Sequence, residues 1–294
     1  MLRRFANSRR HDVCPLCWGQ DLRCIGPIRY ENPVRFSSET IDLENTAELW
    51  RCSSCRSGFT QNSLSLDDAR QLYALGDSGS RWTGAECFVD QKCPEVVTEL
   101  EGLFKTGVHI ADVGCGAGGL LDLAASRGAI TTGVELSRAC QISLRQRGHR
   151  VVEGLEQLDE GGLDVICAFD LVEHLYDLQS FLQLCRGQLA ENGRLVILTG
   201  DIESLSARLA GPRWWYAAYP EHILFPSPSW LAGLAGWQLV RVVRTYASRG
   251  YRQETWRAKR SIARQWMSCS YRGLPALGPD HRLYILQKHG LPDL

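Results

Sequence analysis

The sequence predicts an α/β fold with a parallel sheet, preceded by a small cysteine-rich module. Between residues 108 and 199, short apolar runs alternate with helical stretches of about ten residues, which is the pattern of βαβ units. A glycine-rich turn follows the first apolar run. Two C-x-x-C pairs lie within the first 55 residues. Together these observations indicate one ordinary domain and one smaller unit.

Composition narrows the class of protein. The chain has 294 residues, 44% of them hydrophobic and 22% charged, so it can bury a full core. Lys and Arg total 33, as do Asp and Glu. This balance argues against wholesale binding to a polyanion. No apolar run approaches the roughly 18 residues of a membrane span, and no export signal is recognised, so we expect a cytoplasmic protein with reduced thiols.

The expected elements follow the periodicity of apolar residues. Helices are expected at 67–75, with Ser65 as its cap, and at 91–105, 120–126, 138–147 and 180–189. Strands are expected at 108–113, 130–134, 150–153, 163–169 and 194–199. Two late strands, at 238–245 and 282–287, flank a basic helix near 253–268. Extended runs are expected at 25–36 and 48–51.

These elements suggest a division of the chain. Residues 1–65 form the module, 66–107 a helical linker and 108–294 the main domain. Two insertions interrupt that domain, an aromatic one at 201–228 and a basic helical one at 246–280.

The glycine-rich turn is the strongest local signal. The strand ending at Val113 leads into Gly114, Gly116 and Gly118, where the backbone can take positive φ and approach a ligand closely. Such a turn is either a nucleotide-type site or a purely structural turn. Glu135 ends the next strand, where a carboxylate can accept both hydroxyls of a ribose. Asp112 would repel a dinucleotide's pyrophosphate but suits a cationic ligand.

Three segments together resemble class I S-adenosylmethionine-dependent methyltransferases. The run DVGCGAG at 112–118 is similar to their motif I, FDLVEHL at 169–175 to the segment after strand 4, and NGRLVI at 192–197 to the start of strand 5. The resemblance covers roughly residues 95–245. It implies a Rossmann-like sheet of seven strands, mainly parallel, with a reversed last hairpin.

The resemblance also implies S-adenosylmethionine as cofactor. The three glycines would wrap its methionine part, Glu135 would hold the ribose, and Leu155 would lie near the adenine. Leu155 departs from the acidic residue that is common there, so a side-chain hydrogen bond to adenine is not expected. The implied contacts are Asp112, Gly114, Cys115, Gly116, Gly118, Glu135, Leu136, Leu155, Phe169 and Asp170.

The C-x-x-C pairs predict a structural zinc site. Cys14, Cys17, Cys52 and Cys55 can present four thiolates tetrahedrally, and such a closed site has no open position for catalysis. The 34 residues between the pairs exceed a compact ribbon, so an inserted β excursion is expected in this zinc-ribbon-like module. The alternatives are a redox pair or unligated thiols.

The methyl acceptor would meet residues at the carboxyl edge of the sheet. Asp170, His174 and His222 are the candidate catalytic residues, because a hydroxyl acceptor benefits from a general base. His174 is otherwise a helix-capping polar residue. Trp214, Trp215, Tyr216 and Tyr219 are candidate substrate contacts within the 201–228 substrate loop. The alternative is that these aromatics only cover the edge of the sheet.

The segment 241–264 is strongly basic, with Glu254 as its only acid. It is either a solvated helix face or a contact for a phosphate-bearing substrate or an anionic surface.

Three functions are compatible with these features. The first is methylation of a hydroxyl, or a carbon, of a saccharide, glycolipid or natural-product small molecule. Zinc modules precede the catalytic domain in similar tailoring enzymes, and no Asn-Pro-Pro-Tyr motif for amino-group methylation follows strand 4. The second is methylation of RNA, with the zinc module binding the RNA. The third is a non-catalytic, cofactor-binding scaffold. The sequence gives no indication of the oligomeric state.

Overall fold

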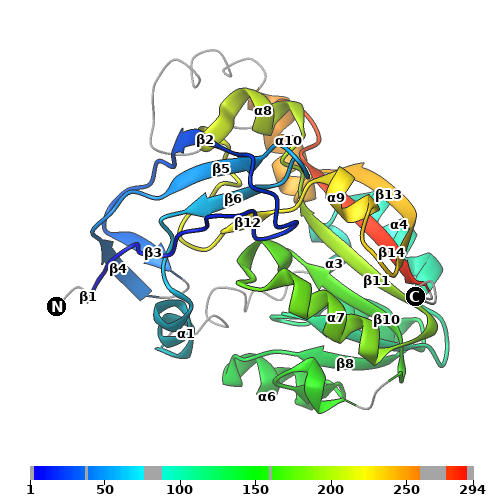
Figure 1. The fold of residues 1–294 in the computed structure, drawn as a ribbon. Helices are drawn as coiled ribbons and strands as arrows, with labels where there is room; N and C mark the ends of the chain where they lie inside the picture. Colours follow the sequence, from blue (N-terminus) through cyan, green and yellow to red (C-terminus); the bar gives the residue numbers. More distant parts are fainter. Residues whose placement is uncertain (1–2, 37–38, 76–87, 159–160, 259–275, 290–294) are drawn as a thin grey trace.

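The computed structural model describes residues 3–36, 39–75, 88–158, 161–258 and 276–289 (Figure 1). Its largest element is a sheet of seven strands in the order β13-β14-β11-β10-β7-β8-β9. The strands are β7 (His109–Val113), β8 (Ile130–Val134), β9 (Arg150–Val152), β10 (Leu163–Phe169), β11 (Leu189–Gly200), β13 (Trp237–Thr245) and β14 (His281–Lys288).

The direction of the strands confirms the predicted sheet. β7, β8, β9, β10 and β11 pair in parallel, whereas β14 runs antiparallel to both β11 and β13. Parallel strands bring their carboxyl ends to one edge, and the reversed β14 begins at that edge, where His281 pairs with Gly200. Side chains far apart in sequence therefore meet at this edge.

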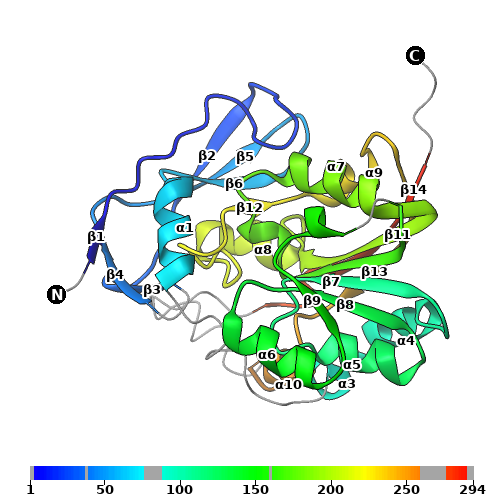
Figure 2. The ribbon, with the colours of Figure 1, turned by 90° about the horizontal axis from the view of Figure 1, so that it is seen from below.

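Helices cover both faces of the sheet, as Figure 2 shows with the sheet between them. On β10, Val165 and Cys167 pack with α4 (Pro94–Leu103) and α5 (Gly119–Ser126). The alternate residues Ile166 and Ala168 pack with α7 (Leu178–Gln188) and α9 (Pro228–Ala232). Strand side chains alternate between faces, so a strand covered on both sides is apolar throughout.

The helix expected at 91–105 is divided in two. α3 (Phe88–Gln91) ends before Cys93, and α4 begins at Pro94. Cys93 is extended, with ψ of 144°, because the proline ring disfavours a helical conformation in the preceding residue. The predicted cap of α1 (Leu66–Leu75) is confirmed, since Asp68 N donates to Ser65 Oγ at 3.1 Å. α6 (Arg138–Gln146) matches its expected range closely.

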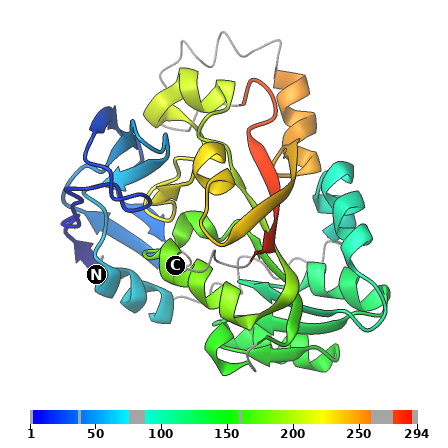
Figure 3. The same cartoon turned by 45° about the vertical axis from the view of Figure 1, so that its right-hand side comes forward.

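The N-terminal module contains more strands than the sequence indicated. β1 (Arg3–Phe5), β4 (Glu39–Leu43) and β3 (Val34–Phe36) form one sheet. β2 (Leu22–Pro27), β5 (Glu48–Cys52) and β6 (Gly58–Gln61) form another, which β12 (Leu224–Phe225) completes. Figure 3 shows the module in blue beside the yellow segment after β11. The module thus shares a sheet with the 201–228 insertion.

The rest of the main domain consists of short elements. They are η1 (Leu155–Gln157), η2 (Val172–His174), α8 (Leu205–Ala210), η3 (Gly211–Arg213) and α10 (Arg249–Ala258). α10 overlaps the predicted basic helix, whose remainder falls outside the described residues, as do positions 259–264 of the basic segment. None of the described helices has both the length and the apolar composition needed to cross a bilayer.

Packing of α6 beneath the glycine turn leads to a first prediction. Leu144 is fully buried, and a Cβ at Gly118 would approach its Cδ2 to 2.2 Å. We expect Leu144→Ala to lower the free energy of unfolding by about 2–5 kcal/mol, measured by urea denaturation, because it leaves a cavity. Ile142 lies on the same helix and is 57% exposed. Ile142→Ala should cost about 0.5 kcal/mol or less, and equal losses in the two variants would contradict this packing.

Candidate functional site

The glycine turn between β7 and α5 forms one wall of the candidate site. Gly114, Gly116 and Gly118 have φ of 70°, 51° and 78°, a region that side chains disfavour. At Gly118 a side chain would also collide with Leu144. The predicted turn is therefore built as expected, with its backbone N–H groups near the start of α5. Cys115 lies within the turn and is half-buried.

Glu135 holds the turn from the end of the neighbouring strand. Its Oε2 accepts a hydrogen bond from Gly116 N at 2.9 Å, and its Oε1 accepts one from Ser137 N at 2.7 Å. The side chain is buried, with 9% exposed. Each carboxylate oxygen keeps a second lone pair, so Glu135 can accept two further hydrogen bonds.

Asp112 adds a second carboxyl group to this wall. Burial, together with the charge of Glu135, raises the pKa of Asp112 to about 8. Two buried carboxyl groups at one site resist simultaneous ionisation unless a cation joins them. The site therefore favours a positively charged ligand, which is the charge that a sulfonium and an ammonium group carry.

The remaining predicted cofactor residues lie at the ends of neighbouring elements. Leu136 directly follows Glu135 and is 70% exposed, whereas Leu155 is buried in η1. Phe169 ends β10, and its ring lies 5.9 Å from that of Phe88. Their roles in binding the cofactor stay predictions.

Asp170 stands at the carboxyl end of β10 in an uncommon conformation. Its φ is 49°, and Lys92 Nζ donates to Oδ2 at 2.7 Å. Burial raises the pKa of Asp170, but the charge and the hydrogen bond of Lys92, together with the nearby His281 and His222, lower it further than burial raises it, so the pKa lies below its ordinary value. Oδ1 is buried without a hydrogen-bond partner among the described residues. Asp170 therefore presents one ionised oxygen to the site.

Glu173, His174 and His222 form a compact group next to Asp170. One ligand atom from each lies within 4.8 Å of the others. The Glu173 carboxylate is fully buried, and it accepts hydrogen bonds from Tyr216 Oη and from Thr199 Oγ1, the latter at 2.9 Å. Such spacing is compatible with a metal ion. All three side chains can also exchange a proton, so the same spacing suits proton transfer.

The two histidines of this group differ in their surroundings. His222 Nδ1 contacts Tyr216 O at 2.7 Å, and its ring meets the His174 ring edge-on, with centroids 4.7 Å apart. Burial and the nearby His174 lower the pKa of His222 to about 3, so it is neutral at neutral pH. The His174 side chain is 25% exposed, and its buried Nδ1 has no hydrogen-bond partner among the described residues.

The structure also adds Asp280 and His281, which the sequence analysis did not single out. Asp280 is fully buried, and its Oδ2 accepts from Trp214 Nε1 at 3.1 Å and from Trp215 Nε1 at 2.6 Å. His281 contacts Asp280 Oδ1 at 3.0 Å and stacks on the Trp215 ring. β14 is antiparallel, so its first residues lie at the carboxyl edge of the parallel strands. The predicted reversal of this strand could therefore have indicated that Asp280 and His281 lie near the site.

Most of the predicted substrate aromatics are buried. Trp214, Tyr216 and Tyr219 are each less than 5% exposed, whereas Trp215 is half-buried. Tyr219 Oη donates to Asn7 of the module, which ties the aromatic segment to the N-terminus. Of the four, Trp215 therefore has the most surface available to a ligand.

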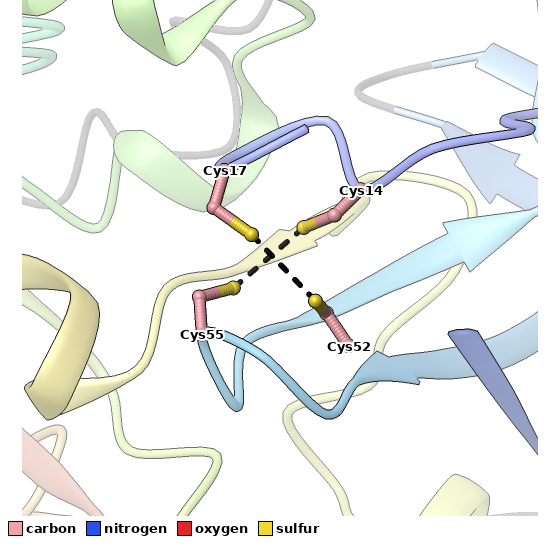
Figure 4. A group of neighbouring side chains, drawn as sticks. All are labelled: Cys14, Cys17, Cys52 and Cys55. Carbon is pink, nitrogen blue, oxygen red and sulfur yellow. Dashed lines mark hydrogen bonds between the residues drawn. The ribbon is translucent and has the colours of Figure 1, made fainter. Parts of the chain in front are cut away.

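The four cysteines of the C-x-x-C pairs converge as expected (Figure 4). Cys14 Sγ lies 3.6 Å from Cys55 Sγ, and Cys17 Sγ lies 3.6 Å from Cys52 Sγ. All four sulfur atoms are within 4.8 Å of one another. Four sulfurs at about 2.3 Å from a central zinc would stand roughly 3.8 Å apart. The arrangement is thus a cage of the size that zinc requires.

Comparisons with known proteins agree with this geometry. Residues 86–241, a little over half of the chain, match the family model described as a methyltransferase domain. The ubiquinone biosynthesis O-methyltransferase of Glaesserella parasuis is 31% identical over 115 residues, covering 34% of this chain and 48% of that protein. That of Idiomarina loihiensis is 28% identical over 114 residues, covering 35% and 46%. The chain spans about half the length of these relatives.

A solved structure shares the fold. A candidate sarcosine dimethylglycine methyltransferase from Galdieria sulphuraria superposes with a TM-score of 0.52 and 17% identity, over 76% of this chain and 99% of that chain.

The neutral state of His222 leads to a prediction about pH. Between about pH 6.5 and pH 3 the unfolded chain binds a proton at His222 that the folded chain excludes, so stability falls as the pH is lowered through this window. His222→Asn should reduce the loss of unfolding free energy between about pH 7 and pH 5, measured in urea. His289 is exposed, and His289→Asn is the control. An unchanged acid sensitivity in His222→Asn would show that the ring is not held neutral.

Proposed function

The chain belongs to the methyltransferase-domain family and is an S-adenosylmethionine-dependent methyltransferase, and from that premise we propose that it methylates a hydroxyl oxygen of a small-molecule acceptor. The observation that carries the proposal is the group of Glu173, His174 and His222 beside Asp170, where the buried Nδ1 of His174 has no hydrogen-bond partner among the described residues. The relatives named as O-methyltransferases support oxygen as the acceptor atom.

The residues of the glycine turn fit the cofactor. When bound, S-adenosylmethionine supplies an activated methyl group. The positive φ of Gly114, Gly116 and Gly118 allows the turn to approach the methionine part. Glu135 would hold the ribose hydroxyls, and Asp112 would ionise beside the positive charge of the ligand. Cys115, Leu136, Leu155 and Phe169 are proposed as further contacts.

His174 is our candidate for the general base. Its Nδ1 has no hydrogen-bond partner among the described residues, and its Nε2 lies 4.0 Å from Glu173 Oε1. An ionised Glu173 would stabilise the imidazolium that forms when His174 accepts the hydroxyl proton. His222, with its low pKa, would orient His174 and the acceptor without taking the proton itself. Asp170, held by Lys92, would fix one side of the site.

The exposed part of the aromatic segment indicates the class of the methyl acceptor. We keep saccharides, glycolipids and natural products as the acceptor classes, because Trp215 offers a flat, partly exposed ring that stacks on His281 and contacts Tyr216. Zinc at Cys14, Cys17, Cys52 and Cys55 is proposed as structural, since the four-sulfur cage leaves no coordination position for a substrate.

Transfer of a radioactive methyl group tests the proposed function. We expect the wild type to label a ribonuclease-resistant small-molecule fraction of a cell extract. His174→Gln should slow that transfer by roughly 10²–10⁴-fold because it removes the base, while the affinity for S-adenosylmethionine stays within about twofold.

The exposed His289 provides the matched control, and His289→Gln should transfer at the wild-type rate. Label that disappears with ribonuclease would identify RNA as the acceptor instead. An unchanged rate in His174→Gln would remove this residue from the chemistry.

The zinc proposal predicts one zinc per chain in the purified protein. Cys17→Ser should lose the metal and lower the melting temperature, because a closed zinc site contributes folding free energy. Cys24 is exposed and lies outside the cage, so Cys24→Ser is the control and should retain the metal. Equal zinc contents in the two variants, measured by mass spectrometry, would contradict the assignment.

A further inference from the structure

A cavity of about 420 Å³ lies where the N-terminal module meets the aromatic segment. One wall comes from residues within 29–35, which follow β2 and run into β3, and the other from residues within 212–219, at η3 and beyond. Its volume is in the range of small-molecule sites, which run from about 300 to 1,000 Å³. The cavity is separate from the glycine turn and from the cysteine cage.

The charges that line this cavity are mostly positive. The described lining residues include Arg29, Arg35 and Arg213, against Glu31 as the only acid. Arg213 is half-buried, and its Nη2 is buried without a hydrogen-bond partner among the described residues. A buried donor that lacks an acceptor costs free energy, so a bound anion that accepts from Arg213 would remove this cost. Guanidinium groups match phosphoryl and carboxylate oxygens in geometry.

Trp215 connects the cavity to the candidate reaction site. It lines the cavity, while its ring stacks on His281, with centroids 5.6 Å apart. The next residue, Tyr216, lies 4.4 Å from the His222 ring and donates to Glu173. The rings of Trp215 and Tyr216 lie 5.4 Å apart, so these two residues connect the cavity to the His222 ring.

We propose that this cavity binds the anionic group of the methyl acceptor, a phosphoryl or carboxylate group. Arg213 is the central contact, and Arg29 and Arg35 contribute from the rim. The rest of the acceptor would lie along Trp215, the lining residue that adjoins the reaction site. This inference rests on the proposed function for the identity of the ligand, but binding of an anion can be measured without methyl transfer.

Calorimetric titration of the full chain tests the cavity, with inorganic pyrophosphate and benzoate as separate probes. We expect saturable binding of one equivalent, and Arg213→Met should weaken it at least tenfold. Arg208 is exposed on the adjacent α8 and does not line the cavity, so Arg208→Met is the matched control and should bind like the wild type. Tighter binding of pyrophosphate would indicate a phosphorylated acceptor, and tighter binding of benzoate a carboxylate.

Equal anion affinity in the wild type and Arg213→Met, or no saturable binding of either probe, would overturn the inference. If Arg213→Met melts at a lower temperature, Arg29→Met replaces it, because the Arg29 side chain is exposed. The affinity for S-adenosylmethionine is measured on the same samples. A failure to bind S-adenosylmethionine would count against the proposed function. Binding of S-adenosylmethionine without binding of either anion would count against this cavity alone.

Discussion

The buried carboxylate of Glu173 is the contact on which the rest of the site depends. Burial raises the pKa of Glu173. A polar group without solvent must be hydrogen-bonded, and Glu173 meets this need through Thr199 on β11 and Tyr216 in the aromatic segment. Its backbone oxygen also accepts from Ile223 N at 2.8 Å. Ile223 O in turn accepts from Thr60 N of the module, so one residue links the central sheet, the insertion and the module.

Asp280 performs a similar task for the two tryptophans of the aromatic segment. It binds both indole N–H groups of Trp214 and Trp215, and it contacts the His281 ring. Two buried carboxylates therefore fix a segment that has little regular secondary structure of its own. This fixation explains how irregular backbone can hold a site as firmly as the strands do.

The parts that sequence predicted well are those that depend on local pattern. The strands at 130–134 and 163–169 match the expected bounds, and so does the glycine turn. Buried strands appear in the sequence as apolar runs, and backbone positions with positive φ appear as glycines. The two C-x-x-C pairs were also sufficient to predict that the four sulfur atoms lie close together. The ion pair of Lys92 with Asp170 was not predictable, since 78 positions separate the two residues. The pairing of β12 with β6 was not predicted either, because a strand of two residues is too short to show a periodic pattern of apolar residues.

The pairing of β12 with β6 also has a consequence for how the protein can be divided. Leu224 and Phe225 are buried, and they pair with Phe59 and Gly58 of β6 in the module. Excising the module would uncover these two side chains and leave β12 with unsatisfied backbone groups. The N-terminal module and the rest of the chain therefore depend on each other structurally. A chimaera that exchanges the module for another would have to keep a strand that pairs with β12. It would also have to keep the position of the chain between His222 and β12.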